Sequence, residues 1–282
     1  VVTTSGDAFA VTGGGTVNVT GAGNSLSATT GTGLLVNHPA SQPVNLNFAS
    51  IVSSGGTSTH GIRLNNISGT VTVTGVTTIG AKTTAGIEIS NSSAVIGLSI
   101  PSTVTITNRP NNGIRIANSS GTIGFGNTTI NSSGVGTPAI RIDASSSAVT
   151  FAQTNINMNG AGGNENFEVS PGNHDAYTPR DNAGNGDAIY VTGLTGSLTI
   201  NGGGITQPGD DGIDIRNSRN LTLSAMTFTE PGRSATAGCV DCNSSGVQAF
   251  GLTGLNSVSN SSFVRGRLRN FYISNPTGTT TL

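Results

Sequence analysis

A four-residue pattern recurs along almost the whole chain: a small residue, an apolar residue, a variable residue and a second apolar residue. Its clearest copies are Gly86-Ile87-Glu88-Ile89 and Gly212-Ile213-Asp214-Ile215. The copies begin at Ala8, Gly33, Gly61, Gly86, Gly113, Ala139, Ala188 and Gly212, with two weaker copies at Cys239 and Phe271. Successive starting points are 25, 28, 25, 27, 26, 49, 24, 27 and 32 residues apart. A nearly fixed period of this size indicates a solenoid, in which similar units stack on one another.

Each unit contains three short segments with the period-2 alternation of β-strands. The repeated core is the first segment. A polar turn such as Asn118-Ser119-Ser120 follows, then a second segment such as residues 70–74 and a third such as residues 103–107. Leucine-rich repeats have a similar period, but their Leu-x-x-Leu-x-Leu pattern is missing and no helical segment completes the unit.

One such unit cannot bury its own apolar face, whereas a stack of units forms a continuous core. We therefore expect an all-β fold, a right-handed parallel β-helix (solenoid) of about nine to ten coils spaced about 4.8 Å apart. Each coil has three short strands. Residues 1–282 form a single domain, which we expect to be a segment of a longer chain. Asn suits the repeated corners because it tolerates left-handed backbone.

The composition agrees with this fold and excludes several others. The chain has 42 Gly among 282 residues and 9% charged residues, and it is poor in residues that favour helix interiors. A hydrophobic content of 34%, mostly Val, Ile and Leu, is too high for a disordered chain. A net charge of -1 without basic clusters argues against nucleic acid as a partner. No apolar run reaches the ~18 residues of a membrane-spanning helix.

These features resemble the right-handed parallel β-helices of the pectin-lyase-like superfamily. The resemblance covers nearly the whole chain and is carried by the small-Ile-x-Ile repeat and the period near 26. More narrowly, the Thr-, Gly- and Asn-rich units are similar to β-helix segments of large bacterial surface and secreted repeat proteins. The resemblance implies an extracellular or cell-surface location and a structural or adhesive role.

The interval of 49 residues contains an insertion of about one coil's length, over residues 159–186. It carries His174, Tyr177 and Arg180 among other polar side chains. Long loops without secondary structure of their own are usually functional or disordered. The insertion is therefore either a ligand-binding loop or a surface decoration.

The variable position of the repeat should point outward, and parallel stacking should place these side chains in one column. In chain order the column reads Leu35, Arg63, Glu88, Arg115, Arg141, Tyr190, Asp214, Asp241 and Tyr272. One interpretation is an ion-pair ladder centred on Glu88. The other is a carbohydrate-binding face, where tyrosines stack on sugar rings and charged groups bind hydroxyls. The ligand contacts that we expect are Arg141, Tyr190, Asp214 and Asp241, with His174, Tyr177 and Arg180 of the insertion.

Two neighbouring units carry carboxylates just before the repeated core. Asp187 lies in Asn185-Gly186-Asp187-Ala188, and Asp210 and Asp211 lie in Gly209-Asp210-Asp211-Gly212. Stacked coils would bring Asp187 and Asp211 within about 5 Å at the backbone. Three roles are open for this set: turn hydrogen bonds, a Ca²⁺ site, or acid–base catalysis.

The same carboxylates resemble the catalytic motifs of the polygalacturonase family of glycoside hydrolases, Asn-Thr-Asp-Gly on one coil and Gly-Asp-Asp-Cys on the next. The resemblance covers residues 185–212 and implies that Asp187, Asp210 and Asp211 are catalytic. Gly186, Ala188 and Gly212 depart from the family's Thr, Gly and Cys, and its later Gly-His-Gly motif is absent.

The two cysteines, Cys239 and Cys242, form a Cys-x-x-Cys pair. One such pair cannot complete a four-ligand zinc site. We expect core or turn thiols, or a local disulfide.

The sequence favours an extracellular or cell-surface rod with a structural or adhesive role and a carbohydrate-binding face. No cofactor is expected apart from calcium at the carboxylates. One alternative is a glycan-cleaving hydrolase or lyase that uses Asp187, Asp210 and Asp211. Another alternative is a filament subunit that associates end to end. Besides a carbohydrate or cell-surface ligand and further copies of itself, the partners of this chain would be flanking domains. No membrane span is expected.

Overall fold

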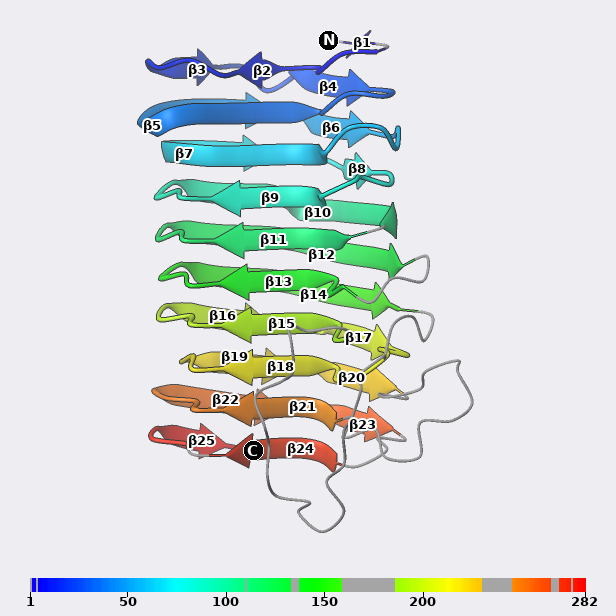
Figure 1. Cartoon of the computed structure of the whole chain (residues 1–282), viewed down its shortest axis with the longest axis vertical. Coiled ribbons are helices and arrows are strands. Elements are labelled where there is room, and N and C mark those ends of the chain that lie inside the picture. The colour runs from blue at the N-terminus through cyan, green and yellow to red at the C-terminus, as the bar shows by residue number, and fades with distance from the viewer. Residues whose placement is uncertain are drawn as a thin grey trace.

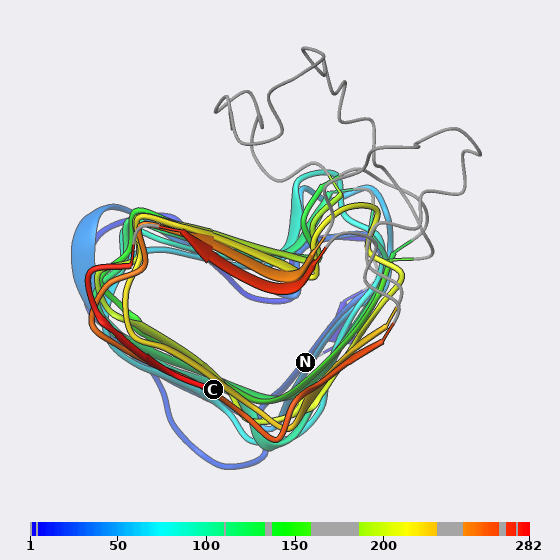
Figure 2. The same ribbon diagram turned by 90° about the horizontal axis from the view of Figure 1, so that it is seen from below.

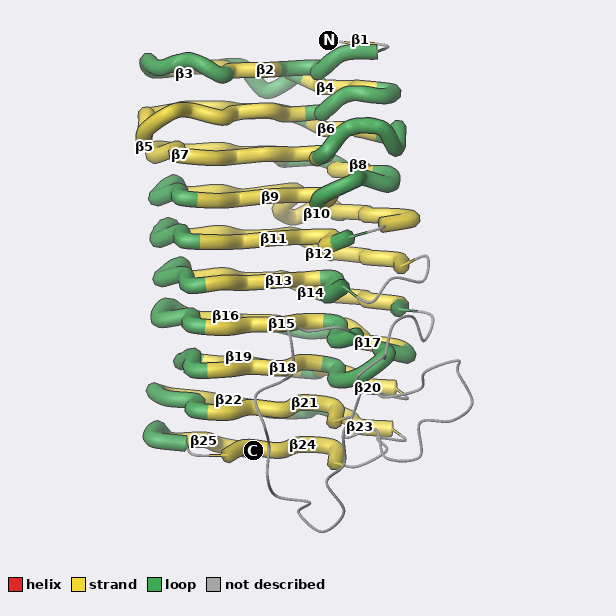
Figure 3. The backbone as a smooth tube through the Cα atoms, in the orientation of Figure 1, coloured by secondary structure: helices red, strands yellow, loops and turns green. Residues whose placement is uncertain are grey.

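The chain winds into a column of stacked coils, with its two ends at opposite ends of the column (Figure 1). The computed structural model describes residues 2–3, 5–109, 111–132, 137–158, 186–229, 245–264, 269–274 and 276–282. Within these ranges the regular structure is β-strand, and no helix occurs (Figure 3). Every pairing between the described strands is parallel, and the strands form one sheet of 25 that winds around a common core. The fold is the expected all-β right-handed parallel solenoid.

Viewed along its axis, each coil has three sides, and we call them faces A, B and C in the order in which the chain visits them (Figure 2). Face A contains the repeated core. Its strands are β2 (Ala10–Val11), the start of β5 (Leu34–Phe48), the start of β7 (His60–Val73), β9 (Ala85–Ser90), β11 (Asn112–Ala117), β13 (Ile140–Asp143), β15 (Ile189–Thr192), β18 (Ile213–Arg216), β21 (Ser245–Phe250) and β24 (Arg269–Ser274).

Faces B and C complete the coil. Face B consists of β3 (Val17–Val19), the second parts of β5 and β7, the first parts of β10 (Val95–Arg109), β12 (Thr122–Ser132) and β14 (Ala148–Asn157), then β16 (Ser197–Ile200), β19 (Leu221–Ser224), β22 (Leu255–Ser259) and β25 (Thr279–Thr281). Face C consists of β1 (Val2–Thr3), β4 (Ser25–Ala28), β6 (Ser50–Ser53), β8 (Thr77–Ile79), the second parts of β10, β12 and β14, then β17 (Gly203–Thr206), β20 (Met226–Thr229) and β23 (Ser262–Val264).

The interior is built from columns of identical or similar side chains. On face A, parallel register aligns Ile62, Ile87, Ile114, Ile140, Ile189, Ile213 and Val247, all fully buried. On face B, the rings of Phe125 and Phe151 stack with centroids 4.7 Å apart, close to the spacing between strands. The alternating pattern therefore becomes a continuous apolar core only when coils stack.

The small residue of the repeat is required by the close approach of neighbouring coils. A Cβ on Gly86 would lie 2.7 Å from the carbonyl oxygen of Gly113, and a Cβ on Gly212 would lie 2.4 Å from that of Gly246. Most larger side chains at these positions would push adjacent coils apart.

The corner between faces A and B uses left-handed backbone at one equivalent position in successive coils. The φ angle is 56° at Asn66, 52° at Asn91, 50° at Asn118, 45° at Ala144, 63° at Gly193, 47° at Asn217 and 63° at Gly251. Asn and Gly are the residues that adopt this conformation at least cost. Next to it, serine hydroxyls accept hydrogen bonds from the backbone of the preceding coil, as Ser145 Oγ does from Ser119 N at 3.0 Å. The expected role of Asn at the corners is confirmed.

One repeat assignment is wrong. The strand that pairs with β18 on face A is β21, with Val247 opposite Ile213 and Gln248 opposite Asp214. The segment Cys-Val-Asp-Cys that begins at Cys239 also fits the pattern of a small, an apolar, a variable and an apolar residue. The copy that pairs with β18 is instead Gly246-Val247-Gln248-Ala249. Asp241 therefore does not follow Asp214 in the column. The position of Tyr272 in the column is confirmed, since it pairs with Gln248.

Candidate functional site

Face A presents the predicted column of variable side chains, which we call the outer column. Its members are Leu35, Arg63, Glu88, Arg115, Arg141, Tyr190, Asp214, Gln248 and Tyr272. The chain has 12 basic and 13 acidic residues. Ten of these 25 lie in the outer column or beside it: Arg63, Glu88, Arg115, Arg141, Asp143, Asp187, Asp210, Asp211, Asp214 and Arg216. Within the described ranges, this charge-poor chain therefore gathers most of its charged side chains along one side.

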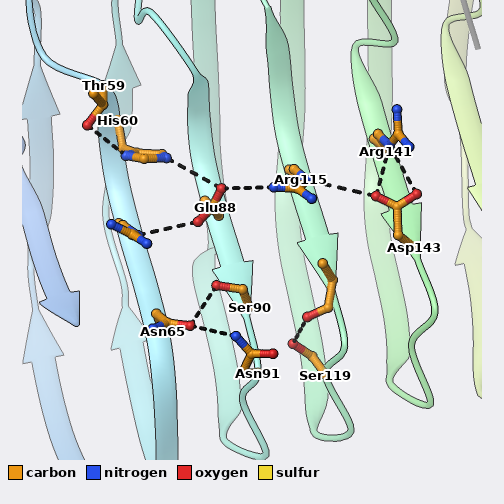
Figure 4. Close-up of polar contacts among 12 residues, drawn as sticks. Thr59, His60, Asn65, Glu88, Ser90, Asn91, Arg115, Ser119, Arg141 and Asp143 are labelled. Atoms are coloured by element: carbon orange, nitrogen blue, oxygen red, sulfur yellow. Dashed lines mark hydrogen bonds and ion pairs between the residues drawn. The ribbon is translucent and has the colours of Figure 1, made fainter. Parts of the chain in front are cut away.

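Glu88 is the centre of the predicted ion-pair ladder (Figure 4). Its carboxylate lies 3.3 Å from Arg63 Nε on the preceding coil and 3.4 Å from Arg115 Nη1 on the following coil. His60 Nε2 lies 3.4 Å from the same group. Contact with the His60 imidazole, aided by Arg63 and Arg115 and opposed by burial, lowers the pKa of Glu88 below its ordinary value. The ladder is confirmed and joins three successive coils.

The ladder continues beyond Arg115 through Asp143. Arg115 Nε lies 3.8 Å from Asp143 Oδ2, and Arg141 Nε lies 2.8 Å from the same oxygen. Sequence reasoning missed Asp143, although Arg141 and Asp143 are two residues apart on one strand and therefore face the same side. The same signal, applied to Asp214 and Arg216, would have found the next ion pair.

Tyr190 lies between two guanidinium groups. The Cζ atoms of Arg141 and Arg216 are 5.4 and 5.6 Å from the centroid of its ring, distances at which a cation is attracted to the π-face. Arg216 Nη2 is 2.6 Å from Asp214 Oδ2. Burial and the nearby Asp214 carboxylate raise the pKa of Tyr190. Three of the expected ligand contacts, Arg141, Tyr190 and Asp214, are thus neighbours, although Tyr190 and Asp214 are buried.

The predicted acidic cluster also forms. Asp187 precedes β15, and Asp210 and Asp211 precede β18 on the next coil. One carboxylate oxygen from each lies within 4.8 Å of the others, so the cluster could hold a metal ion. All three side chains are buried, with 1, 5 and 1% of their surfaces exposed.

Two of these carboxylates also join coils. Asp187 Oδ1 accepts a hydrogen bond from Asp211 N at 3.1 Å, and Asp211 Oδ1 accepts one from Ser245 N. Asp7, at the equivalent position of the first coil, accepts one from Thr32 N at 2.7 Å. All three positions lie two residues before the first inward apolar residue of the repeat. We call Asp7, Asp187 and Asp211 the capping carboxylates. The expected backbone capping is confirmed for Asp187 and Asp211, and it joins neighbouring coils and not residues of one turn.

Burial, followed by the charges of Asp214, Asp210 and Asp211, raises the pKa of Asp187 well above its ordinary value. Its second oxygen, Oδ2, is buried and accepts no hydrogen bond from the residues that the structure describes. A buried polar atom in this condition is uncommon in folded proteins. The Asp187 Oδ2 atom is therefore a buried oxygen that is suited to accept from a cation or a donor.

Several predicted residues lie outside the described ranges. These are His174, Tyr177 and Arg180 of the insertion at 159–186, with Asp241, Cys239 and Cys242 of the segment before β21. The ligand-contact and disulfide predictions for them stay predictions.

In comparison with known proteins, no family model, no curated protein and no solved structure matches the chain. In the described part of the chain, no helix is long and apolar enough to cross a membrane.

Proposed function

We propose that this chain is a rigid β-helical rod that acts outside the cell or at its surface, in a structural or adhesive role, and that it contacts carbohydrate through face A. Parallel pairing from β1 to β25 supports the rod, because each coil is tied to its neighbours by backbone hydrogen bonds on three faces. We assign it to the pectin-lyase-like superfamily, among β-helix segments of bacterial surface and secreted proteins, on its repeat and coil shape.

The outer column supports the ligand assignment through what it presents to solvent. The side chains of Arg63, Arg115 and Arg141 are 33, 39 and 26% exposed. The carboxylates that pair with them are more buried, at 8% for Glu88 and 17% for Asp143. Among these described residues the accessible charge is therefore basic, and guanidinium groups bind carboxylates and similar oxyanions in bidentate geometry. This observation favours acidic carbohydrate.

A binding screen with neutral, uronate-containing and sulfated glycans tests the assignment. We expect Arg63→Gln combined with Arg115→Gln to abolish binding of acidic glycans. Arg219→Gln is the matched control, since Arg219 is exposed on the corner that leads into face B. Failure of the parent chain to bind any glycan would refute the ligand role. Electron microscopy of the same sample would show whether single rods or end-to-end filaments form.

The acidic cluster supports a second candidate, cleavage of glycans by Asp187, Asp210 and Asp211. Burial raises the pKa of Asp187, as it does for the carboxyl groups that act as general acids in enzymes. The burial of all three groups opposes this, because a catalytic carboxyl must reach the glycosidic oxygen. Asp187→Asn and Asp211→Asn should abolish release of reducing ends from acidic polysaccharides if the candidate is correct. An inactive parent chain would exclude it.

As a rod, the protein would use calcium as a structural ion. Clustered carboxylates are hard oxygen donors, which suit Ca²⁺ better than soft transition metals.

A further inference from the structure

The acidic cluster occupies a special place in the solenoid. The interval between the repeats at Ala139 and Ala188 is 49 residues, nearly twice the usual length. The coils that contain β15 and β18 are the first two after this interruption. Asp187 belongs to the first of them, and Asp210 and Asp211 belong to the second. The cluster therefore spans the first coil-to-coil junction after the regular repeat resumes.

Backbone hydrogen bonds account for only part of this cluster. Asp187 Oδ1 accepts from Asp211 N, and Asp211 Oδ1 accepts from Ser245 N. Asp7 performs the same capping role at the first coil, without a described carboxylate cluster around it. Capping therefore explains one carboxylate per coil. It does not explain the position of Asp187 Oδ2, which is buried and accepts no hydrogen bond within the described residues.

The charged groups around Asp187 also favour a bound cation. Asp214 lies near Asp187 but has its own counter-charge, since Arg216 contacts it through Nε at 2.9 Å and Nη2 at 2.6 Å. The charged groups that raise the pKa of Asp187 are Asp214, Asp210 and Asp211, and burial contributes most. Gathering carboxylates in a buried place is costly unless a cation offsets their charge.

We propose that Asp187, Asp210 and Asp211 are the protein side-chain ligands of one Ca²⁺ ion, with Asp187 Oδ2 as a ligand atom, and that this ion clamps the coils of β15 and β18 together. The inference rests on the structural rod of the proposed function and is independent of carbohydrate binding. Ca²⁺ takes 6–8 oxygen ligands, so backbone carbonyls and water would supply the rest. The ion is structural because its ligands are buried and two of them already join coils.

Calorimetric titration of the chelator-treated chain with CaCl2 tests the proposal, together with thermal unfolding in EDTA and in Ca²⁺. We expect one Ca²⁺ per chain and a Tm that rises with Ca²⁺ concentration, because a ligand that binds only the folded state stabilises it. Asp187→Asn and Asp210→Asn should each weaken binding at least tenfold. Asn at position 187 keeps an oxygen that can accept from Asp211 N.

Asp7→Asn is the matched control, since it changes a capping carboxylate away from the cluster and should leave Ca²⁺ binding unchanged. Circular dichroism in EDTA establishes whether each variant is folded. If Asp187→Asn does not fold, Asp210→Asn is the variant that tests the site. Absence of binding at millimolar Ca²⁺, or equal binding by the parent chain and a folded Asp210→Asn variant, overturns the site. Glycan binding that persists in EDTA would then leave the proposed function standing.

Discussion

The backbone amide of Asp211 donates a hydrogen bond to the Asp187 carboxylate, 3.1 Å away on the preceding coil. Asp211 uses its own carboxylate in the same way towards Ser245 N. At this corner a side-chain oxygen thus takes the place of a backbone carbonyl as the acceptor of the amide, whereas Ala85 N, at the equivalent position of another coil, donates to the Thr59 carbonyl. The relationship occurs at two consecutive junctions and again between Asp7 and Thr32, so it joins coils and is not confined to one local turn.

This relationship predicts a difference between two substitutions of Asp211. In chelator, Asp211→Ala should lower the free energy of unfolding by about 1–3 kcal/mol relative to Asp211→Asn, because alanine leaves the buried Ser245 amide without its acceptor. Both variants remove the charge, so the comparison isolates the hydrogen bond. Urea unfolding followed by circular dichroism measures the difference. Equal stability of the two variants would contradict the capping role.

The ladder centred on Glu88 predicts a pH dependence of stability. The folded pKa of Glu88 lies below its ordinary value of 4.5, so the unfolded chain binds the proton more tightly. The stabilisation is therefore complete above pH 4.5 and is lost as the pH falls through the folded pKa. Glu88→Gln should flatten this acidic loss and cost about 1.5–3 kcal/mol at neutral pH. Urea midpoints measured from acidic to neutral pH report both effects.

Arg63→Gln is the control for this prediction, because it removes one partner of the ladder and keeps the Glu88 carboxylate. It should leave part of the pH dependence, since His60 and Arg115 still contact Glu88. An acid profile identical in the parent chain and in Glu88→Gln would show that the ladder adds nothing to stability.

The left-handed corner predicts a stabilising substitution. Ala144 has a φ angle of 45° at the corner position where other coils have Asn91, Asn118 and Asn217. A left-handed conformation costs alanine roughly 1–2 kcal/mol, and Asn tolerates it better. Ala144→Asn should therefore raise the free energy of unfolding by about 0.5–1 kcal/mol. Asn118→Ala is the reverse control and should lower it by a similar amount. Chemical denaturation of both variants checks the sign, and a destabilised Ala144→Asn chain would contradict the account.

The close approach of coils predicts which glycines can be replaced. Gly86→Ala would place a Cβ 2.7 Å from the Gly113 carbonyl oxygen, and a strained core of this kind costs about 1–3 kcal/mol. Gly97→Ala is the control, because a Cβ on Gly97 meets nothing within 4 Å. We expect a lower Tm for the first variant and little change for the second. A reversed order would mean that the coils are spaced differently.

Much of the fold could be predicted because its information is local and repeated. The repeat placed Ile87, Ile114 and Ile213 in one interior column, and the structure confirms that register. The ladder around Glu88 followed from the same register, since the variable residue of each copy has the same direction. The gathering of Asp187 with Asp211 followed from their matching positions before the repeat core.

The misplaced coil shows where this reasoning fails. Cys239 and Gly246 both begin a segment that fits the pattern, and only pairing with β18 selects the second. Contacts such as those of His60 with Glu88 and Arg216 with Tyr190 were also missed. They depend on side-chain reach between coils, which a repeat pattern does not contain.

The sequence alone determined that this chain is a parallel solenoid, because alternation, small residues and corner asparagines recur at one period, and each copy indicates the same coil. Only the tertiary structure decided which polar side chains become buried and what they contact. It covers Asp187 and Asp214 while leaving Arg63 and Arg115 partly exposed. Burial and much of the charge pairing depend on the neighbouring coils in space, and residues that meet across two coils are far apart along the chain, as Asp187 and Asp211 are by 24 residues.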